Sequence, residues 1–211
     1  MHPSSFDHMQ DLARRYLARE RSLHVLDIGS YDVNGSYRPI FDRPSWRYQG
    51  LDLSAGPNVD IVLATPYRFP VKSNSVDVVI SGQAFEHIEF FWLTWLELVR
   101  VVRPGGLIFL IAPSSGAPHR YPVDCWRYYP DGFRALARYG AVKLIEVSTD
   151  WKRDPGPHDC QWMDTVGVFR KPEVTPFERI VAGLEHIVLQ RLSEWIVRRH
   201  PRGHPESSPT Q

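Results

Sequence analysis

The stretch VLDIGSYDVNG, residues 25–35, decides the fold class of this 211-residue chain. Val25, Leu26 and Ile28 give a short buried β-strand, and the strand ends at Gly29, where a residue without a Cβ lets the backbone approach a ligand closely. In open α/β sheets, ligands bind at the carboxyl ends of the strands, at a turn between strand and helix. The stretch therefore predicts an α/β protein with a ligand-binding loop after its first strand.

The same loop departs from the dinucleotide fingerprint. That fingerprint, G-x-G-x-x-G, needs glycines at fixed offsets so that a pyrophosphate can meet bare backbone. Here Tyr31 and Val33 occupy positions that glycines would need. A carboxylate at the strand end, Asp27, suits a cationic or amine-bearing ligand better than an anionic one. A dinucleotide ligand is disfavoured.

Three further segments continue an alternation of strands and helices. YQGLDLS, residues 48–54, is a short strand that ends on Asp52, about 20 residues beyond the loop, where a carboxylate can bind ribose hydroxyls. VDVVISGQAFEHI (76–88) and LVRVVRPGGLIFLIAP (98–113) each contain a β-branched strand, and Arg103-Pro104-Gly105-Gly106 reads as a turn between a helix and a strand. These segments predict βαβ units that bind a nucleoside.

In these motifs the chain resembles the class I S-adenosylmethionine-dependent methyltransferases over roughly residues 22–170. The resemblance implies a Rossmann-like fold, with a mostly parallel central sheet, an antiparallel edge and flanking helices. It also implies S-adenosyl-L-methionine as the cofactor. The usual second and third loop glycines are Tyr31 and Val33 here, and the acidic residue often placed before the adenine contact is replaced around Ala64-Thr65. The residues implied for cofactor binding are Asp27, Gly29, Ser30, Tyr31, Asp52, Leu53, Gln83 and His87.

A narrower resemblance lies in GSYDVNGSYRPIF (29–41) and PHRYPVDCWRYYPDGF (118–133), which are similar to sugar O-methyltransferases of polysaccharide and glycan biosynthesis. It implies methyl transfer to a hydroxyl of a sugar or oligosaccharide, such as a mannoside. Aromatic rings can pack on the flat C–H faces of sugars, although core or edge packing explains such rings equally well. The residues assigned to the acceptor side are Tyr31, Asn34, Glu86, Arg120, Tyr121 and Trp126.

Transfer to a hydroxyl calls for a group that removes its proton, and His119 is the best candidate. It lies in the long irregular loop after the strand that ends at Pro113; the alternative is an ordinary surface histidine. Asp124 is the second catalytic candidate, since it could orient His119, bind a sugar hydroxyl, help hold a cation or simply cap a turn. Mg²⁺ held by Glu86, His119 or Asp124 is an open alternative that no spacing demands, so no metal is assigned.

Length and composition favour one domain. With 43% hydrophobic residues, the chain can build a full core, so we expect a single methyltransferase domain over residues 1–200. Residues 85–102 are predicted to form an aromatic-rich helix. Helical spacing of apolar residues predicts an N-terminal helix over 5–19 and a long amphipathic helix over 176–200. The apolar face of the second helix could pack on its own domain or form a homodimer. Residues 201–211 are expected to be a disordered tail.

Charge and hydropathy exclude other classes. The formal net charge is +1 and the basic residues are dispersed, which excludes a nucleic-acid substrate. No run approaches the roughly 18 apolar residues of a membrane span, and the N-terminus lacks the pattern of a signal peptide. The sequence thus predicts a cytoplasmic enzyme with a small-molecule acceptor and no membrane partner.

Two other functions stay open. A methyltransferase of the same fold could act on a small phenolic, carboxylate or amine metabolite, and a carboxylate acceptor would need no base. A non-catalytic module that binds the cofactor is a third reading, because one scaffold hosts many functions.

Overall fold

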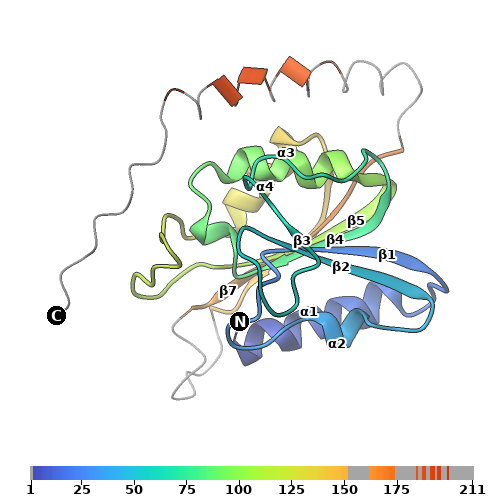
Figure 1. The fold of residues 1–211 in the computed structure, drawn as a ribbon. Helices are drawn as coiled ribbons and strands as arrows, with labels where there is room; N and C mark the ends of the chain where they lie inside the picture. Colours follow the sequence, from blue (N-terminus) through green and yellow to red (C-terminus); the bar gives the residue numbers. More distant parts are fainter. Residues whose placement is uncertain are drawn as a thin grey trace. The chain divides into compact units, whose positions relative to one another are not determined.

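The computed structural model describes residues 2–151 and 162–173, together with residues 184, 187, 188, 191, 192, 194, 195 and 199. Its centre is a seven-stranded sheet with the strand order β3-β2-β1-β4-β5-β7-β6 (Figure 1). The strands are β1 Leu23–Ile28, β2 Trp46–Asp52, β3 Ile61–Val62, β4 Val76–Gly82, β5 Val102–Pro113, β6 Lys143–Thr149 and β7 Asp164–Arg170.

One strand of the sheet runs against the others. The pairs β1–β2, β1–β4, β2–β3 and β4–β5 are parallel, whereas β7 pairs antiparallel with both β5 and β6. The antiparallel strand β7 therefore lies one position in from the edge, between β5 and the edge strand β6. The predicted fold class, a mostly parallel Rossmann-like sheet with flanking helices and an antiparallel edge region, is confirmed.

Helices cover both faces of the sheet. Helices α1 (Pro3–Leu17) and α2 (Arg38–Phe41) lie on one face, and α3 (Phe91–Val101) and α4 (Pro130–Tyr139) lie on the other (Figure 1). Alternate residues of β5 enter opposite cores: Ile108 packs in the core with α3 and α4, and Phe109 packs in the core with α1 and α2. Burial on both faces explains the continuous apolar runs that the sequence shows in its strands.

Two predicted elements have different bounds in the structure. The N-terminal helix predicted over 5–19 runs over Pro3–Leu17, with Pro3 in its first turn, where the missing N–H is harmless. Residues 85–102, predicted as one helix, form a short 3₁₀ helix η1 (Phe85–His87) and then α3. The helix is broken because the carbonyls of Ile88 and Glu89 accept the indole N–H of Trp126 instead of helical donors.

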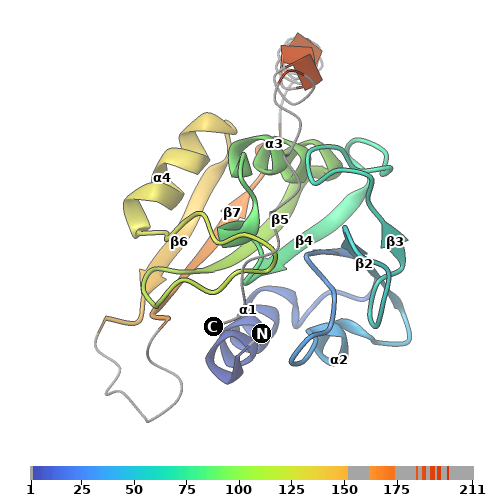
Figure 2. The ribbon, with the colours of Figure 1, turned by 60° about the vertical axis from the view of Figure 1, so that its left-hand side comes forward.

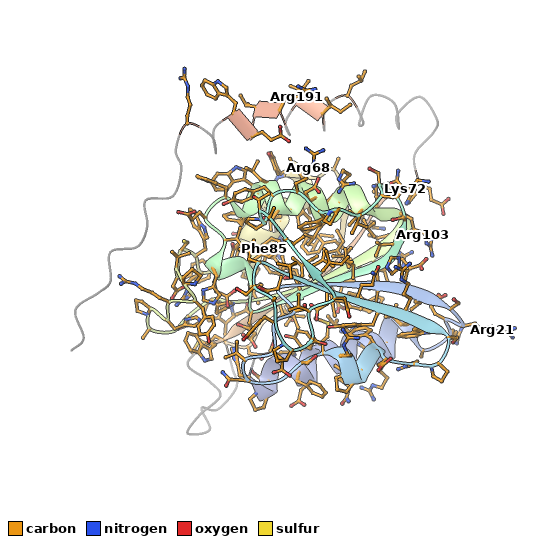
Figure 3. The ribbon with its side chains drawn as sticks, in the orientation of Figure 1. Arg21, Arg68, Lys72, Phe85, Arg103 and Arg191 are labelled. Carbon is orange, nitrogen blue, oxygen red and sulfur yellow. The ribbon has the colours of Figure 1, made fainter. Side chains whose placement is uncertain are left out.

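The chain divides into two compact units, residues 1–173 and 174–211. In the first unit, Phe85 lies inside the ribbon, whereas the side chains of Arg21 and Arg103 project outward (Figure 3). In the second unit the described residues are helical, and their large apolar side chains are half exposed or more: Leu184, Ile187, Val188, Leu192 and Trp195. The tail predicted over 201–211 and much of the helix predicted over 176–200 lie outside the described residues. In the described part of the chain, no helix is both long and apolar enough to cross a membrane.

Candidate active site

The predicted site residues gather along one edge of the sheet. Strands β1, β2, β4 and β5 are parallel, so the turns that follow them meet at the same edge (Figure 2). Gly29 follows β1, Asp52 ends β2, and Gln83 follows β4. Strand β7 runs in the opposite direction, so it begins where β5 ends, and its first residue, Asp164, pairs with Pro113. Asp164 therefore lies at the end of the sheet where the parallel strands finish. Residues far apart in the sequence thus meet where α/β proteins bind their ligands.

The loop after β1 is held tightly at Gly29. Its φ of +78° lies in the left-handed region, and a Cβ added there would lie 2.3 Å from the Cβ of Ala84. The backbone N–H groups of Gly29 and Ser30 both donate to the carbonyl of Leu51, at 2.9 and 3.1 Å. The buried Ser30 hydroxyl donates to the carbonyl of Asn58 at 3.2 Å. Only glycine fits this turn, as its place after the first strand predicts.

Asp52 offers a carboxylate beside that loop. One of its oxygens accepts the backbone N–H of Tyr31 and the other accepts that of Ser54, each at 3.1 Å. A carboxylate has about four lone-pair sites, so this half-buried group retains capacity for two ligand hydroxyls. Leu53, next in the chain, is exposed, and the ring of Tyr31 packs over Gly56. The arrangement fits a ribose, which is what the nucleoside prediction requires.

Asp27 lies beneath the loop and not on its surface. The carboxylate is 2% exposed and accepts the hydroxyl of Tyr48. Asn58 donates from its side-chain amide to the Tyr48 hydroxyl at 3.1 Å and to the carbonyl of Ser30 at 2.8 Å. Asp27 thus supports the loop through Tyr48 and Asn58. Burial raises the pKa of Asp27 from 3.8 to about 7, against the hydrogen bond from Tyr48 and the charge of Arg38.

The raised pKa of Asp27 makes stability depend on pH. In the unfolded chain this carboxyl loses its proton near pH 3.8, whereas the folded chain keeps it until about pH 7. The contribution of Asp27 to the free energy of unfolding is therefore complete below pH 3.8 and is lost as the pH rises to about 7. Between pH 4 and pH 8, we expect the free energy of unfolding of the wild type to fall by about 2–4 kcal/mol relative to that of Asp27→Asn. Urea unfolding at each pH measures both free energies.

Asp131→Asn is the matched control for this prediction, because Asp131 is highly exposed in the first turn of α4. Its stability is expected to follow that of the wild type at every pH. Parallel curves for Asp27→Asn and the wild type would contradict the prediction, because the carboxyl would then titrate equally in both states.

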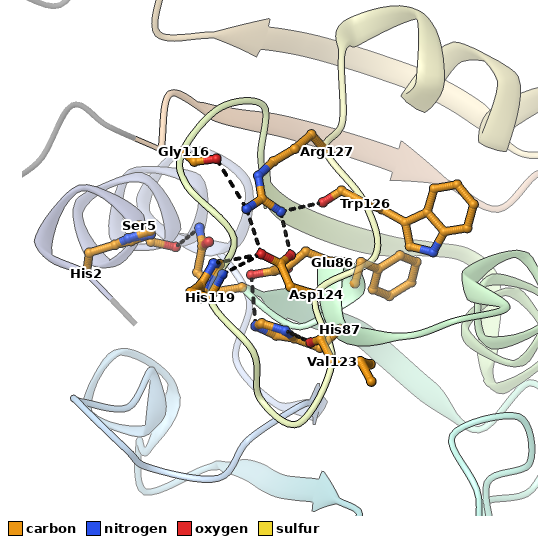
Figure 4. A network of polar contacts seen from close by, with 12 residues as sticks. His2, Ser5, Glu86, His87, Gly116, His119, Val123, Asp124, Trp126 and Arg127 are labelled. Carbon is orange, nitrogen blue, oxygen red and sulfur yellow. Dashed lines mark hydrogen bonds and ion pairs between the residues drawn. The ribbon is translucent and has the colours of Figure 1, made fainter. Parts of the chain in front are cut away.

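A second network is centred on Asp124 in the irregular loop between β5 and α4 (Figure 4). Arg127 donates to both of its oxygens, at 2.5 and 2.8 Å. The backbone N–H of His119 donates to Asp124 Oδ2 at 2.7 Å, and the ring Nδ1 of His119 lies 3.2 Å from the same oxygen. Arg127 holds the pKa of Asp124 down at about 2, so this carboxylate is charged at working pH. Asp124 is placed to orient His119.

Glu86 and His87 lie next to this network. The side chain of Glu86 is fully buried, and neither of its oxygens has a hydrogen-bond partner in the described part of the chain. His87 Nε2 lies 3.6 Å from Glu86 Oε1, and the rings of His87 and His119 are 4.9 Å apart between centroids (Figure 4). Burial raises the pKa of Glu86 to about 8 and lowers that of His87. The backbone N–H of Cys125 donates to the carbonyl of Glu86 at 2.7 Å, which docks the loop on η1.

The sequence assigned His87 to the cofactor and Glu86 to the acceptor, and the structure brings both to His119.

Gln83 lies at a φ of +59° and donates from Nε2 to Asp164 Oδ1 at 2.9 Å and to Ser5 Oγ at 3.2 Å. The start of α1 therefore reaches this edge of the sheet, which the sequence analysis missed. No local sequence signal marks either partner of Gln83.

The residues predicted to bind the acceptor are less clustered. Trp126 packs its ring against Phe91 at 5.2 Å between centroids, and its indole N–H is bonded to the break before α3. Tyr121 is 60% exposed, and Asn34 and Arg120 are exposed as well. Within residues 2–151 and 162–173, no hydrogen bond or ion pair of these three side chains ties them to the Asp124 network. Free, exposed side chains of this kind are available to an acceptor.

Mg²⁺ fits this site poorly. Glu86, His87 and His119 are the group of the described residues that could hold a metal ion, and they offer one carboxylate and two imidazoles. Mg²⁺ prefers oxygen ligands. Asp124, the other acid at hand, already has both oxygens paired with Arg127.

The strand order, the tight glycine turn after β1 and the carboxylate at the end of β2 are those of a Rossmann-like fold of the class I methyltransferase type. Residues 26–110 match the model of the methyltransferase domain family.

Several known proteins are similar to this chain in sequence or in fold. An uncharacterized methyltransferase of Mycobacterium sp. (strain KMS) is 32% identical over 124 residues, covering 54% of this chain and 48% of the relative. The chain thus spans about half the length of the curated relatives it matches. Among solved structures, the 1,6-didemethyltoxoflavin-N1-methyltransferase of Burkholderia thailandensis, with bound S-adenosylhomocysteine, is similar with a TM-score of 0.63 at 15% identity, covering 81% of this chain and 79% of that one. The [4+2]-cyclase SpnF is similar with a TM-score of 0.61 at 13% identity, covering 80% and 82%. These structures share the fold.

Proposed function

We propose that this chain is an S-adenosylmethionine-dependent O-methyltransferase that acts on a hydroxyl of a sugar or oligosaccharide, with a mannoside as one candidate. The observation that carries the proposal is the placing of His119. His119 lies next to Asp124, at the same edge of the sheet as Gly29 and Asp52, the residues that we assign to the nucleoside. The methyltransferase domain match and the fold support the same class of reaction.

The first part of the proposal is the cofactor side. Bound S-adenosylmethionine would supply a methyl group on a positively charged sulfur. Gly29 and Ser30 provide close backbone approach, and the carboxylate of Asp52 accepts hydrogen bonds from the ribose hydroxyls. Tyr31 and Leu53 border the ribose. Asp27 acts from below through Tyr48.

The second part is the acceptor side. His119 takes the proton of the acceptor hydroxyl, and the charged carboxylate of Asp124 stabilises the imidazolium that results. Arg127 fixes Asp124 with two hydrogen bonds, so the imidazole is oriented before the acceptor binds. The exposed rings of Tyr121 and Trp126 provide surfaces for the C–H faces of a sugar, and Arg120 provides donors for its hydroxyls.

A methyltransferase for a small amine, phenolic or carboxylate metabolite is the second candidate. The buried Glu86 favours the amine among these, because its unpaired carboxylate could bind a protonated amine next to His119. SpnF adds a reason to test turnover directly, since a cyclase shares the fold.

Two measurements test the proposed function in sequence. Calorimetric titration of the purified protein with S-adenosylmethionine should show one site per chain. Incubation with cofactor labelled on its methyl group, in the presence of mannosides, other glycans, phenols, carboxylates and amines, should place label on a sugar. Label on an amine would favour the second candidate. Binding without transfer to any acceptor would favour a non-catalytic module, and absence of binding would refute the cofactor assignment.

A further inference from the structure

The side-chain carboxylate of Glu86 lacks hydrogen-bond partners in the described part of the chain. The residue is fully buried. A buried polar group without a partner costs free energy, so such a group is usually completed by a water molecule, an ion or another ligand. The nearest ring nitrogen, His87 Nε2, is 3.6 Å away, beyond hydrogen-bond distance. Glu86 therefore calls for a partner that binds between it and the histidines.

The two histidines present nitrogen atoms suited to a metal ion. His87 Nδ1 lies 2.6 Å from the carbonyl oxygen of Val123. Since a carbonyl only accepts, Nδ1 carries the proton and Nε2 turns a lone pair toward Glu86 (Figure 4). The ring Nδ1 of His119 lies 3.2 Å from Asp124 Oδ2 without the alignment of a hydrogen bond, and the backbone N–H of His119 donates to the same oxygen at 2.7 Å. Metal-binding histidines typically donate their other ring N–H to a backbone carbonyl or a carboxylate.

The spacing of the three side chains is close to that of a metal site. One donor atom from each of Glu86, His87 and His119 lies within 4.8 Å of the others. Bonds of about 2.1 Å to a shared ion need donors about 3.3 Å apart, so the side chains would have to move by roughly 1 Å. A carboxylate with two imidazoles suits transition metals. We propose that Glu86, His87 and His119 bind a divalent transition-metal ion such as Zn²⁺, with positions left open for water or an acceptor oxygen.

This inference rests on the proposed function only for the role of the ion. A divalent ion at this place lies where the acceptor is proposed to bind, and it lowers the pKa of a bound hydroxyl. His119 cannot hold an ion and accept a proton at the same nitrogen. With the ion bound, His119 would be a ligand, and the ion would acidify the acceptor hydroxyl, whose proton would pass to solvent water.

Metal binding by the full-length chain tests the inference without any acceptor. The protein is stripped with a chelator and titrated with Zn²⁺ by calorimetry, and with Co²⁺ by visible absorption, which reports the ligands around the ion. Glu86→Gln keeps the size of the buried side chain, and His119→Ala alters a partly exposed side chain in an irregular loop. His8→Ala is the matched control, because His8 pairs with Asp150 at 2.6 Å outside the cluster. Circular dichroism checks that each variant is folded.

We expect the wild type and His8→Ala to bind one Zn²⁺ per chain and to show the same Co²⁺ absorption bands. Glu86→Gln and His119→Ala should each bind Zn²⁺ at least about 100-fold more weakly and lose these bands. A wild type that binds no ion, or variants that bind as tightly as the wild type, would overturn the inference, and so would displacement of Zn²⁺ by an equal concentration of Mg²⁺. Metal binding without methyl transfer would refute only the proposed function; transfer by a chain that binds no ion would refute only the metal site.

Discussion

Gly29→Ala is expected to lower the free energy of unfolding by about 2–5 kcal/mol and to abolish measurable binding of S-adenosylmethionine. Two effects add. At a φ of +78° a side chain strains the backbone, which costs about 1–2 kcal/mol. The new Cβ would also lie 2.3 Å from the Cβ of Ala84, a distance that forces the loop or the start of η1 to move. Urea unfolding and calorimetry measure the two outcomes.

Two further variants separate these effects. Gly132→Ala is the matched control, because a Cβ in that first turn of α4 meets nothing within 4 Å and alanine favours a helix. It should leave cofactor binding unchanged and stability equal or slightly higher. In the double variant Gly29→Ala/Ala84→Gly the contact is relieved and only the φ strain is left. If Gly29→Ala were as stable as Gly132→Ala and bound the cofactor, the tight turn would not hold the ligand.

The parts of the fold that the sequence predicts are those set by local pattern. Apolar runs locate the strands, and a glycine after the first of them locates the ligand loop, because side-chain periodicity and backbone freedom are properties of neighbouring residues. The acid at the end of β2 was found for the same reason. His119 and Asp124 lie five residues apart in one loop, and the structure joins them directly.

Contacts between distant segments could not be predicted in this way. Ser4 and Asp164 are 160 residues apart, yet the Ser4 hydroxyl donates to the Asp164 carboxylate at 3.2 Å. No local pattern encodes that pairing, which depends on α1 packing beside β7. The sequence also did not predict that Asp27 is buried, since the alternation of residues along β1 does not show that Tyr48 covers its side chain. The break between η1 and α3 depends on Trp126, about 37 residues farther along the chain.

His119→Ala is expected to lower turnover by about 10²–10⁴-fold and to leave the affinity for S-adenosylmethionine unchanged. The loss has the same direction whether His119 takes the proton or holds an ion. The cofactor affinity is maintained because His119 lies in the loop between β5 and α4, whereas Gly29 and Asp52 belong to the turns after β1 and β2. The measurement is turnover of the acceptor found in the labelling panel, with calorimetry for the cofactor.

Two comparisons make this prediction specific. His8→Ala, which removes a histidine paired with Asp150, should retain full turnover. Asp124→Asn should lose less than His119→Ala, because the neutral amide still accepts the backbone N–H of His119 but no longer stabilises a positive charge on the ring. Near wild-type turnover in His119→Ala would remove this residue from the chemistry. It would then favour a carboxylate acceptor, which is already ionised at neutral pH and so can be methylated without a base or a metal ion.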